Sequence, residues 1–225
     1  IKKTDVFFPI APESRNKLIS LIKLNKYSKK ILSNSEKAII KTGNKYKTYK
    51  FFKKNSIPTI ETFNNKKINF NIAKSWVVKP KDGAGSEKSY IFKNNEKLKE
   101  FLISNKNFIV QPLIKGDSYS ANIITLNKKI FVLNFNKQKV LYNKNKIIFK
   151  GTNFRKKIPC EKRVKKYINK IYKKIPGLNS FFGIDFIISK KKIYFLEINP
   201  RITTSYINIS KKLKINPAKI IFKSL

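Results

Sequence analysis

Apolar residues recur at helical spacing in several stretches of the chain and predict amphipathic helices there. In the clearest case Val164, Ile168 and Ile171 follow one stripe, with lysines between them. The predicted helices are residues 14–30, 35–41, 45–54, 96–105 and 163–175, followed by a helical tail from residue 203.

Short runs of aromatic and β-branched residues, bounded by Gly, Pro or Asn, predict strands between these helices. Residues 75–80 and 89–92 flank a glycine-containing turn and predict a hairpin. Helices segregated from antiparallel strands indicate an α+β architecture. The other predicted strands are residues 6–10, 108–111, 121–126, 129–135, 139–141, 181–189 and 192–199.

The balance of charges is strongly basic, because 52 Lys+Arg against 12 Asp+Glu give a formal net charge of +40. A basic face is typical of nucleic-acid binding. Here, however, 48 of the cations are lysines spread along the chain and only 4 are arginines, whose planar fork suits phosphate best. We therefore attribute the charge to a biased composition and expect nucleic-acid binding to be no more than non-specific.

The composition also excludes several function classes. Without histidine, and with Cys160 as the single cysteine, the chain cannot form a Ser-His-Asp triad, a histidine-ligated zinc site or an internal disulfide. A 41% hydrophobic content with 18 Phe and 10 Tyr predicts a packed core. No apolar run of about 18 residues and no signal peptide is visible, so we expect no membrane span and a cytoplasmic location. Because the chain begins at Ile1, we expect it to be part of a longer protein.

A lysine followed by a glycine-rich loop is the first candidate site. Lys79 ends an apolar strand, and Gly83, Gly85 and Ser86 follow it closely. Glycines let backbone N–H groups approach phosphate oxygens, and the lysine supplies a positive charge. The segment matches neither a Walker A sequence nor a dinucleotide fingerprint. An ordinary hairpin turn with a chance lysine is the alternative.

Carboxylates inside two apolar strands are the second candidate site. Asp185 lies in the strand that begins at Phe181, and Glu197, Asn199 and Arg201 follow in the next. A carboxylate in an apolar strand is costly unless it is paired or binds a cation. Glu197 and Asn199 leave the same strand face, and oxygen ligands suit Mg²⁺. Simple salt bridges to lysines are the alternative.

The register of this hairpin decides whether the carboxylates meet. We predict a three-residue turn at 190–192, which puts Asp185 opposite Glu197 on one face, with their oxygens within about 5 Å. A slip by one residue would put Leu196 opposite Asp185 and separate the two carboxylates. Mild backbone strain is expected at Lys191 or Lys192.

A strand that runs into a proline-containing bend is the third candidate site. Its exposed backbone groups could read an adenine edge, and Asp117 could accept hydrogen bonds from ribose hydroxyls. A plain strand-loop-strand is the alternative. The bend consists of Gln111, Pro112, Leu113 and Ile114.

Taken in this order, the three segments resemble the ATP-grasp superfamily over residues 45–201, most specifically in Glu197-Ile198-Asn199-Pro200-Arg201. Two further segments, residues 8–13 and 199–206, are similar to its tyramine–glutamate ligase group. The resemblance implies a ligase that activates a carboxylate as an acyl phosphate and joins it to an amine, with a γ-glutamyl amide as one product class. It also implies ATP and Mg²⁺ or Mn²⁺ as cofactors, small carboxylate and amine substrates, and a homodimer as one option for assembly.

The resemblance further assigns roles and domains. Lys45 and Lys79 would contact ATP phosphates beneath the loop of Gly83, Gly85 and Ser86. Gln111, Pro112, Leu113 and Ile114 would line adenine, and Asp117 would face the ribose. Asp185, Glu197 and Asn199 would hold metal, and Arg201 and Lys79 would be catalytic. Residues 1–43 would be the remnant of a preceding α/β domain, with ATP-grasp subdomains at 44–110 and 111–225.

The chain also departs from the family pattern at two positions. Asn44 stands where such enzymes often have aspartate. Gly183 stands where many ligases have an arginine, so one phosphate charge would lack its partner unless Arg201 compensates. A nucleotide-binding ATP-grasp protein without ligase activity, or a basic nucleic-acid-binding module, is the alternative function.

Overall fold

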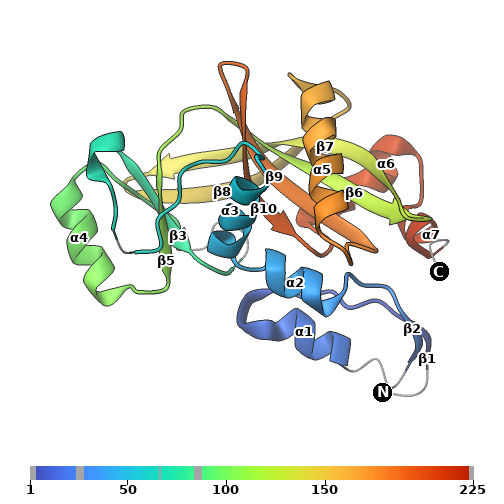
Figure 1. The fold of residues 1–225 in the computed structure, drawn as a ribbon. Coiled ribbons are helices and arrows are strands. Elements are labelled where there is room, and N and C mark those ends of the chain that lie inside the picture. The colour runs from blue at the N-terminus through green and yellow to red at the C-terminus, as the bar shows by residue number, and fades with distance from the viewer. Residues whose placement is uncertain (1–3, 24–27, 66, 84–87, 223–225) are drawn as a thin grey trace.

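A computed structural model describes residues 4–23, 28–65, 67–83 and 88–222 of the chain. It contains a small two-stranded parallel sheet and a long sheet in the strand order β10-β9-β6-β7-β8-β4-β3-β5. Figure 1 shows α4 and the β3–β5 region at one end, α6 and α7 at the other, and the small sheet with α1 and α2 below. Mixed helices and antiparallel strands confirm the predicted α+β class.

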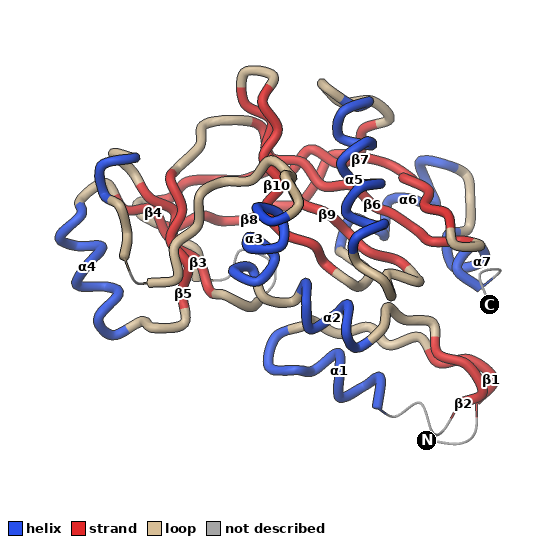
Figure 2. The backbone as a smooth tube through the Cα atoms, viewed as in Figure 1, coloured by secondary structure: helices blue, strands red, loops and turns tan. Residues whose placement is uncertain are grey.

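The elements follow one another as shown in Figure 2. The strands are β1 (Thr4–Phe7), β2 (Ser28–Ile31), β3 (Trp76–Pro80), β4 (Tyr90–Phe92), β5 (Phe108–Pro112), β6 (Asp117–Leu126), β7 (Lys129–Asn143), β8 (Lys146–Arg155), β9 (Phe181–Ser189) and β10 (Lys192–Asn199). The α-helices are α1 (Lys17–Ile22), α2 (Glu36–Thr42), α3 (Lys45–Lys54), α4 (Asn95–Ser104), α5 (Glu161–Lys174), α6 (Ile207–Leu213) and α7 (Pro217–Phe222). Short 3-10 turns are η1 (Ser14–Asn16), η3 (Phe70–Ile72) and η4 (Thr204–Tyr206). None of the helices described is long and apolar enough to cross a membrane.

Three sequence predictions need correction. Residues 14–30 do not form one helix, because α1 ends at Ile22 and β2 pairs in parallel with β1 instead. The two strands predicted at 129–135 and 139–141 are one strand, β7. Its partner β8 was not predicted, since its apolar residues Ile147, Ile148 and Phe149 are consecutive and do not alternate with polar ones.

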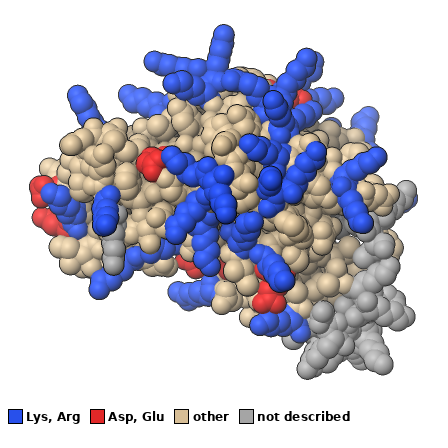
Figure 3. Space-filling view, viewed as in Figure 1, with Lys and Arg blue, Asp and Glu red and all other residues tan. Residues whose placement is uncertain are grey.

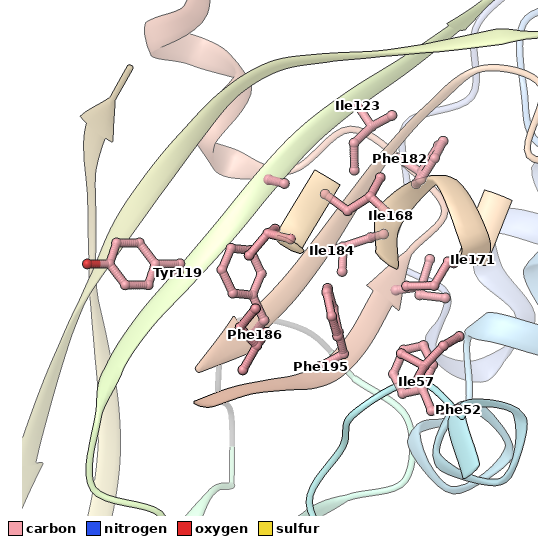
Figure 4. Close-up of a cluster of buried hydrophobic side chains, with 14 of the residues drawn as sticks. Phe52, Ile57, Tyr119, Ile123, Ile168, Ile171, Phe182, Ile184, Phe186 and Phe195 are labelled. Atoms are coloured by element: carbon pink, nitrogen blue, oxygen red, sulfur yellow. The ribbon is translucent and has the colours of Figure 1, made fainter. Parts of the chain in front are cut away.

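The main core lies on the face of the large sheet that α5 covers. Val164, Ile168 and Ile171 of α5 are fully buried, as the helical stripe predicted. They pack against residues of β9 with even numbers, among them Phe182 and Ile184 (Figure 4). Because side chains alternate along a strand, the residues of β9 with odd numbers face the opposite side of the sheet, where the cleft lies.

Candidate active site

A cleft of about 370 Å³ is lined by residues from both ends of the large sheet, β3 and β5 at one end and β9 and β10 at the other. Its lining brings together most of the site residues predicted from the sequence, which come from six separate segments. They are Lys45, Lys79, Gly83, Gln111, Pro112, Leu113, Ile114, Asp185, Glu197, Asn199 and Arg201. Gly85 and Ser86 fall outside the described residues, so their predicted roles stay predictions.

A β-bulge sets the register of the hairpin that carries the carboxylates. Ser189 pairs with Lys192, so the turn has two residues rather than three, and both Lys190 (φ 45°) and Lys191 (φ 64°) are left-handed. The predicted strain is therefore present at Lys191 but not at Lys192. On this turn alone, Leu196 would face Asp185. The register shifts between Phe195 and Glu197, however, so that Glu197 pairs with Asp185.

The bulge changes which face each side chain takes. Before it, Phe195 pairs with Phe186 and both are buried in the core. After it, Glu197 pairs with Asp185 and both line the cleft. The predicted pairing is thus correct, while the predicted turn length is wrong.

Helix α3 places Lys45 over this carboxylate pair. Asn44 caps the helix, because its side-chain oxygen accepts hydrogen bonds from the backbone N–H groups of Tyr46 and Lys47 at 3.0 Å. The amide therefore does the capping that an aspartate would do here. Lys45 Nζ lies 3.1 Å from Glu197 Oε2 and donates to the carbonyl of Gly83 at 2.9 Å. The helix is held in place by Phe52, whose ring packs 6.2 Å from that of Phe195.

The charges in the cleft are tightly coupled. Burial raises the pKa of Asp185 well above its usual range, and the neighbouring Glu197 carboxylate raises it further. Burial also works to raise the pKa of Glu197, but Lys45 and Lys79 outweigh it and hold that pKa at about 2. Burial lowers the pKa of Lys79, and the charge of Lys45 acts in the same direction. Two lysines and two carboxyl groups thus share one cleft, and each group shifts the pKa of its neighbours.

Hydrogen bonds fix Asp185 from two strands. Asn199 Nδ2 donates to one carboxyl oxygen at 3.3 Å, and Gln138 Nε2 of β7 donates to the other at 3.2 Å. Gln138 was not among the predicted site residues, because nothing in the sequence around it indicates that its side chain points toward Asp185. Ser120, which pairs with Asp185 on β6, also lines the cleft and was missed.

Asp117 is the predicted residue that the structure does not bring to the cleft. It is exposed, forms a 2.8 Å ion pair with Lys137, and shares its strand face with Tyr119, which is buried in the core. Ser118 and Ser120, one residue out of phase, line the cleft instead. The ribose prediction for Asp117 is therefore not supported, because alternation along β6 aims its side chain at the other face.

Arg201 lines the cleft beside Asn199 and is held by an ion pair from the start of the chain. Its Nε donates to Glu13 Oε2 at 3.0 Å, and one terminal nitrogen donates to the carbonyl of Ile202 at 3.1 Å. The side chains of Arg201 and Glu13 are only 13% and 6% exposed. The segment around residue 13 thus reaches the same site as the end of β10.

Gly183, which stands where the resemblance leads one to expect an arginine, is tightly packed against Thr203. A Cβ added at Gly183 would come within 2.7 Å of Thr203 Cγ2. Thr203 cannot easily move away, because its hydroxyl donates to Asn122 Oδ1 at 3.0 Å and contacts Ser205 Oγ at 2.8 Å. An arginine at 183 has no room in this arrangement.

We therefore expect Gly183→Ala to destabilise the protein by about 1–3 kcal/mol through overpacking. Thermal unfolding would show this as a midpoint lowered by several degrees. Adding Thr203→Ser should recover most of the loss, since serine lacks the obstructing methyl group and keeps the hydroxyl. An unchanged midpoint for Gly183→Ala, or no recovery in the double variant, would contradict this account.

The cleft brings lysines and paired carboxyl groups face to face, an arrangement suited to an enzyme that binds phosphate groups and a cation. The chain belongs to the ATP-grasp domain family, whose family model matches residues 42–205. A tyramine–L-glutamate ligase from Methanocaldococcus fervens is 32% identical over 224 residues, which is 99% of this chain and 67% of that protein. Its counterpart from Methanocaldococcus jannaschii is 32% identical over 98% of this chain and 62% of that protein.

Solved structures agree on the fold. An ATP-grasp superfamily protein from Archaeoglobus fulgidus superposes with a TM-score of 0.74 at 24% identity, covering 98% of this chain and 66% of that one. The chain therefore spans about two thirds of the length of the proteins it matches. Family and relatives support ATP-dependent carboxylate–amine ligation as the class of reaction.

Proposed function

We propose that this chain carries the nucleotide site of a ligase that phosphorylates a substrate carboxylate and then joins it to an amine. The observation that carries the proposal is the cluster of Lys45, Lys79, Asp185 and Glu197 in one cleft. The names of the curated relatives add the finer proposal, a γ-glutamyl amide as product and glutamate and an aromatic amine as substrates.

The residue roles follow from position in the cleft. Adenine would lie against the strand end of β5, where Gln111, Pro112, Leu113 and Ile114 line the cleft. Lys45 and Lys79 would bind the phosphates, and Arg201 would bind the transferred phosphoryl group. Gly83 lies in the loop that follows Lys79. Glycine suits this position, because its φ of +123° is one that other residues rarely adopt.

The residues present fit a divalent cation. Asp185 and Glu197 lie opposite each other in the hairpin and both line the cleft, so two carboxyl groups that a cation could hold are side by side. Asn199 adds an amide oxygen, and an all-oxygen donor set suits Mg²⁺ or Mn²⁺. Within the described residues no cluster of three or more His, Cys, Asp or Glu offers another site. When bound, the cation would neutralise charge on the phosphate oxygens.

The proposed reaction has two steps. A carboxylate oxygen attacks the γ-phosphorus of ATP, the bond to ADP breaks, and an acyl phosphate forms. The amine nitrogen then attacks the acyl carbon, phosphate leaves, and the nitrogen loses a proton as the amide forms. Lys45, Lys79 and Arg201 would stabilise the negative charge in both steps, so no histidine is needed.

We also propose the division of the chain into residues 1–43, 44–110 and 111–225. Residues 1–43 contain the separate β1–β2 sheet, and α3 begins directly after them. The boundary at 110/111 lies inside β5, which passes directly into the proposed adenine-binding bend. A homodimer is proposed with this arrangement, and the mass of the full chain in solution would test it.

Nucleic-acid binding gains no specific support. Lys and Arg side chains are spread over the visible face in Figure 3, with uncharged surface between them. Affinity for polyanions that falls with salt would follow from such a surface under either function. Thermal stabilisation by MgATP distinguishes the two, because only the nucleotide site requires it.

A phosphate-release screen of the full chain tests the proposal. We expect MgATP to raise the unfolding midpoint and phosphate release to require both a carboxylate and an amine, with glutamate and tyramine as the first pair. Stabilisation without turnover for any pair would indicate the nucleotide-binding protein without ligase activity. No stabilisation at all would refute the nucleotide site.

A further inference from the structure

One wall of the cleft is apolar and is not used by the proposed nucleotide site. It consists of Val140 and Tyr142 on β7 with Ile147 and Phe149 on β8, and we call it the ribbon wall. These strands run along the molecule to reach β4, where Tyr90 pairs with Lys146 (Figure 2). Tyr142 is 61% exposed, so its ring is accessible.

The ribbon wall is built by cross-strand pairs. Val140 lies directly opposite Phe149, and Tyr142 lies opposite Ile147. Between Gln138 and Val140 the register shifts, so that one residue of β7 faces two of β8. Gly151, with φ +111°, lies in this bulge. The polar pair Gln138–Thr152 therefore takes the same face as the apolar pairs and forms the inner end of the wall, next to Asp185.

The ribbon wall and the adenine-binding bend lie on different parts of the sheet. Strand β8 is separated from β5 by β4 and β3. Measured along the sheet, three inter-strand steps amount to about 14 Å. On the opposite side of the cleft, Ile187 of β9 is separated from β7 by β6, and Leu196 of β10 lies one strand further away. An adenine at the bend would thus leave the ribbon wall free, with the charged cluster between them.

The polar end of the cleft suits the carboxylate substrate. Arg201 lies there with the hydroxyl-bearing residues Thr203, Thr204 and Ser205. A glutamate, with two carboxylates and an ammonium group, matches such a lining and does not match four apolar side chains. The apolar surface therefore remains for the other substrate.

We propose that the ribbon wall binds the aromatic side chain of the amine substrate, with the amine nitrogen directed past Gln138 and Thr152 toward the charged cluster. This inference rests on the proposed ligase function and adds to it the residues that select the amine. Aromatic and aliphatic faces favour a planar ring, whereas a short alkyl amine would leave Tyr142 and Phe149 without a partner.

Steady-state kinetics of the full chain with tyramine and with ethylamine test the inference, at saturating MgATP and glutamate. Tyr142→Ala and Phe149→Ala should each raise the KM for tyramine about tenfold and reduce the preference for tyramine over ethylamine. The KM values for ATP and glutamate should stay within about twofold. Leu141→Ala and Ile148→Ala are the matched controls, because these residues alternate with the ribbon wall on the same strands and do not line the cleft.

The possible outcomes distinguish a failure of the proposed amine site from a failure of the proposed ligase function. Equal effects of the wall and control variants on tyramine, with turnover retained, would overturn the inference and leave the ligase function standing. A raised KM for ATP in Tyr142→Ala or Phe149→Ala would also overturn it, because the wall would then belong to the nucleotide. Absence of amine-dependent phosphate release in the unmodified protein would overturn both.

Discussion

Glu197→Gln is expected to reduce amine-dependent phosphate release by at least about 1000-fold while the protein still folds. The substitution keeps the size of the side chain but removes the charge that faces Lys45 at 3.1 Å. It also removes one of the two carboxylates proposed to hold the cation, and only Asp185 and the amide of Asn199 would remain. Phosphate release measured beside a thermal unfolding curve checks both parts of the expectation.

Glu96→Gln is the matched control for this variant. Glu96 lies on α4, is 72% exposed, and pairs with Lys99 three residues away. An exposed pair of this kind contributes little to stability, so the control should turn over at the normal rate. Turnover of Glu197→Gln within tenfold of the control would refute the metal assignment.

The pairing of Glu197 with Asp185 also shows how far the sequence alone could lead. Two carboxylates in apolar strands are costly without a partner, and this cost predicted that they face each other. The turn and the bulge at Leu196 that achieve it were not predictable, since a three-residue turn gives the same pairing. The sequence therefore indicated that the two carboxylates pair, but it did not indicate the turn length and the bulge by which the backbone pairs them.

Apolar spacing explains both a success and a failure. The buried stripe of α5 followed directly from apolar spacing, and the structure confirms it. Asp117 was selected for its chemistry and its distance along the chain, without regard to which face of β6 it would take. Tyr119, two residues on and buried, already indicated that this face belongs to the core.

Contacts between distant segments were beyond reach from one sequence. The ion pair of Glu13 with Arg201 joins residues 188 positions apart. Glu13 stood inside a segment that resembled the tyramine–glutamate ligase group, but nothing in its neighbours specified a partner. The same holds for Gln138, which reaches Asp185 from a strand 47 residues earlier.

Arg201→Ala is expected to lower the rate of ligation by about 100- to 1000-fold, because removing one group that stabilises transition-state charge costs this much in other enzymes. Binding of MgATP should change little, since Lys45 and Lys79 remain. The measurements are single-turnover phosphate release and MgATP-dependent thermal stabilisation. Equal turnover in Arg201→Ala and the unmodified protein would show that the guanidinium takes no part in phosphoryl transfer.

Glu13 should act through Arg201 rather than on the substrate. Its Oε2 fixes the guanidinium, while its Oε1 is buried and has no hydrogen-bond partner among the residues that the structure describes. Glu13→Ala is therefore expected to slow ligation about 10- to 100-fold, as loss of a group that orients an active-site residue typically does. Glu13→Gln, which keeps an oxygen acceptor, should recover part of the rate. In the Arg201→Ala background, Glu13→Ala should slow ligation almost no further, because the residue that Glu13 orients is gone.

If the two substitutions instead lowered the rate independently, so that their effects multiplied, Glu13 would have a role of its own. Equal unfolding midpoints of Glu13→Ala and Glu13→Gln would exclude a difference in stability as the cause.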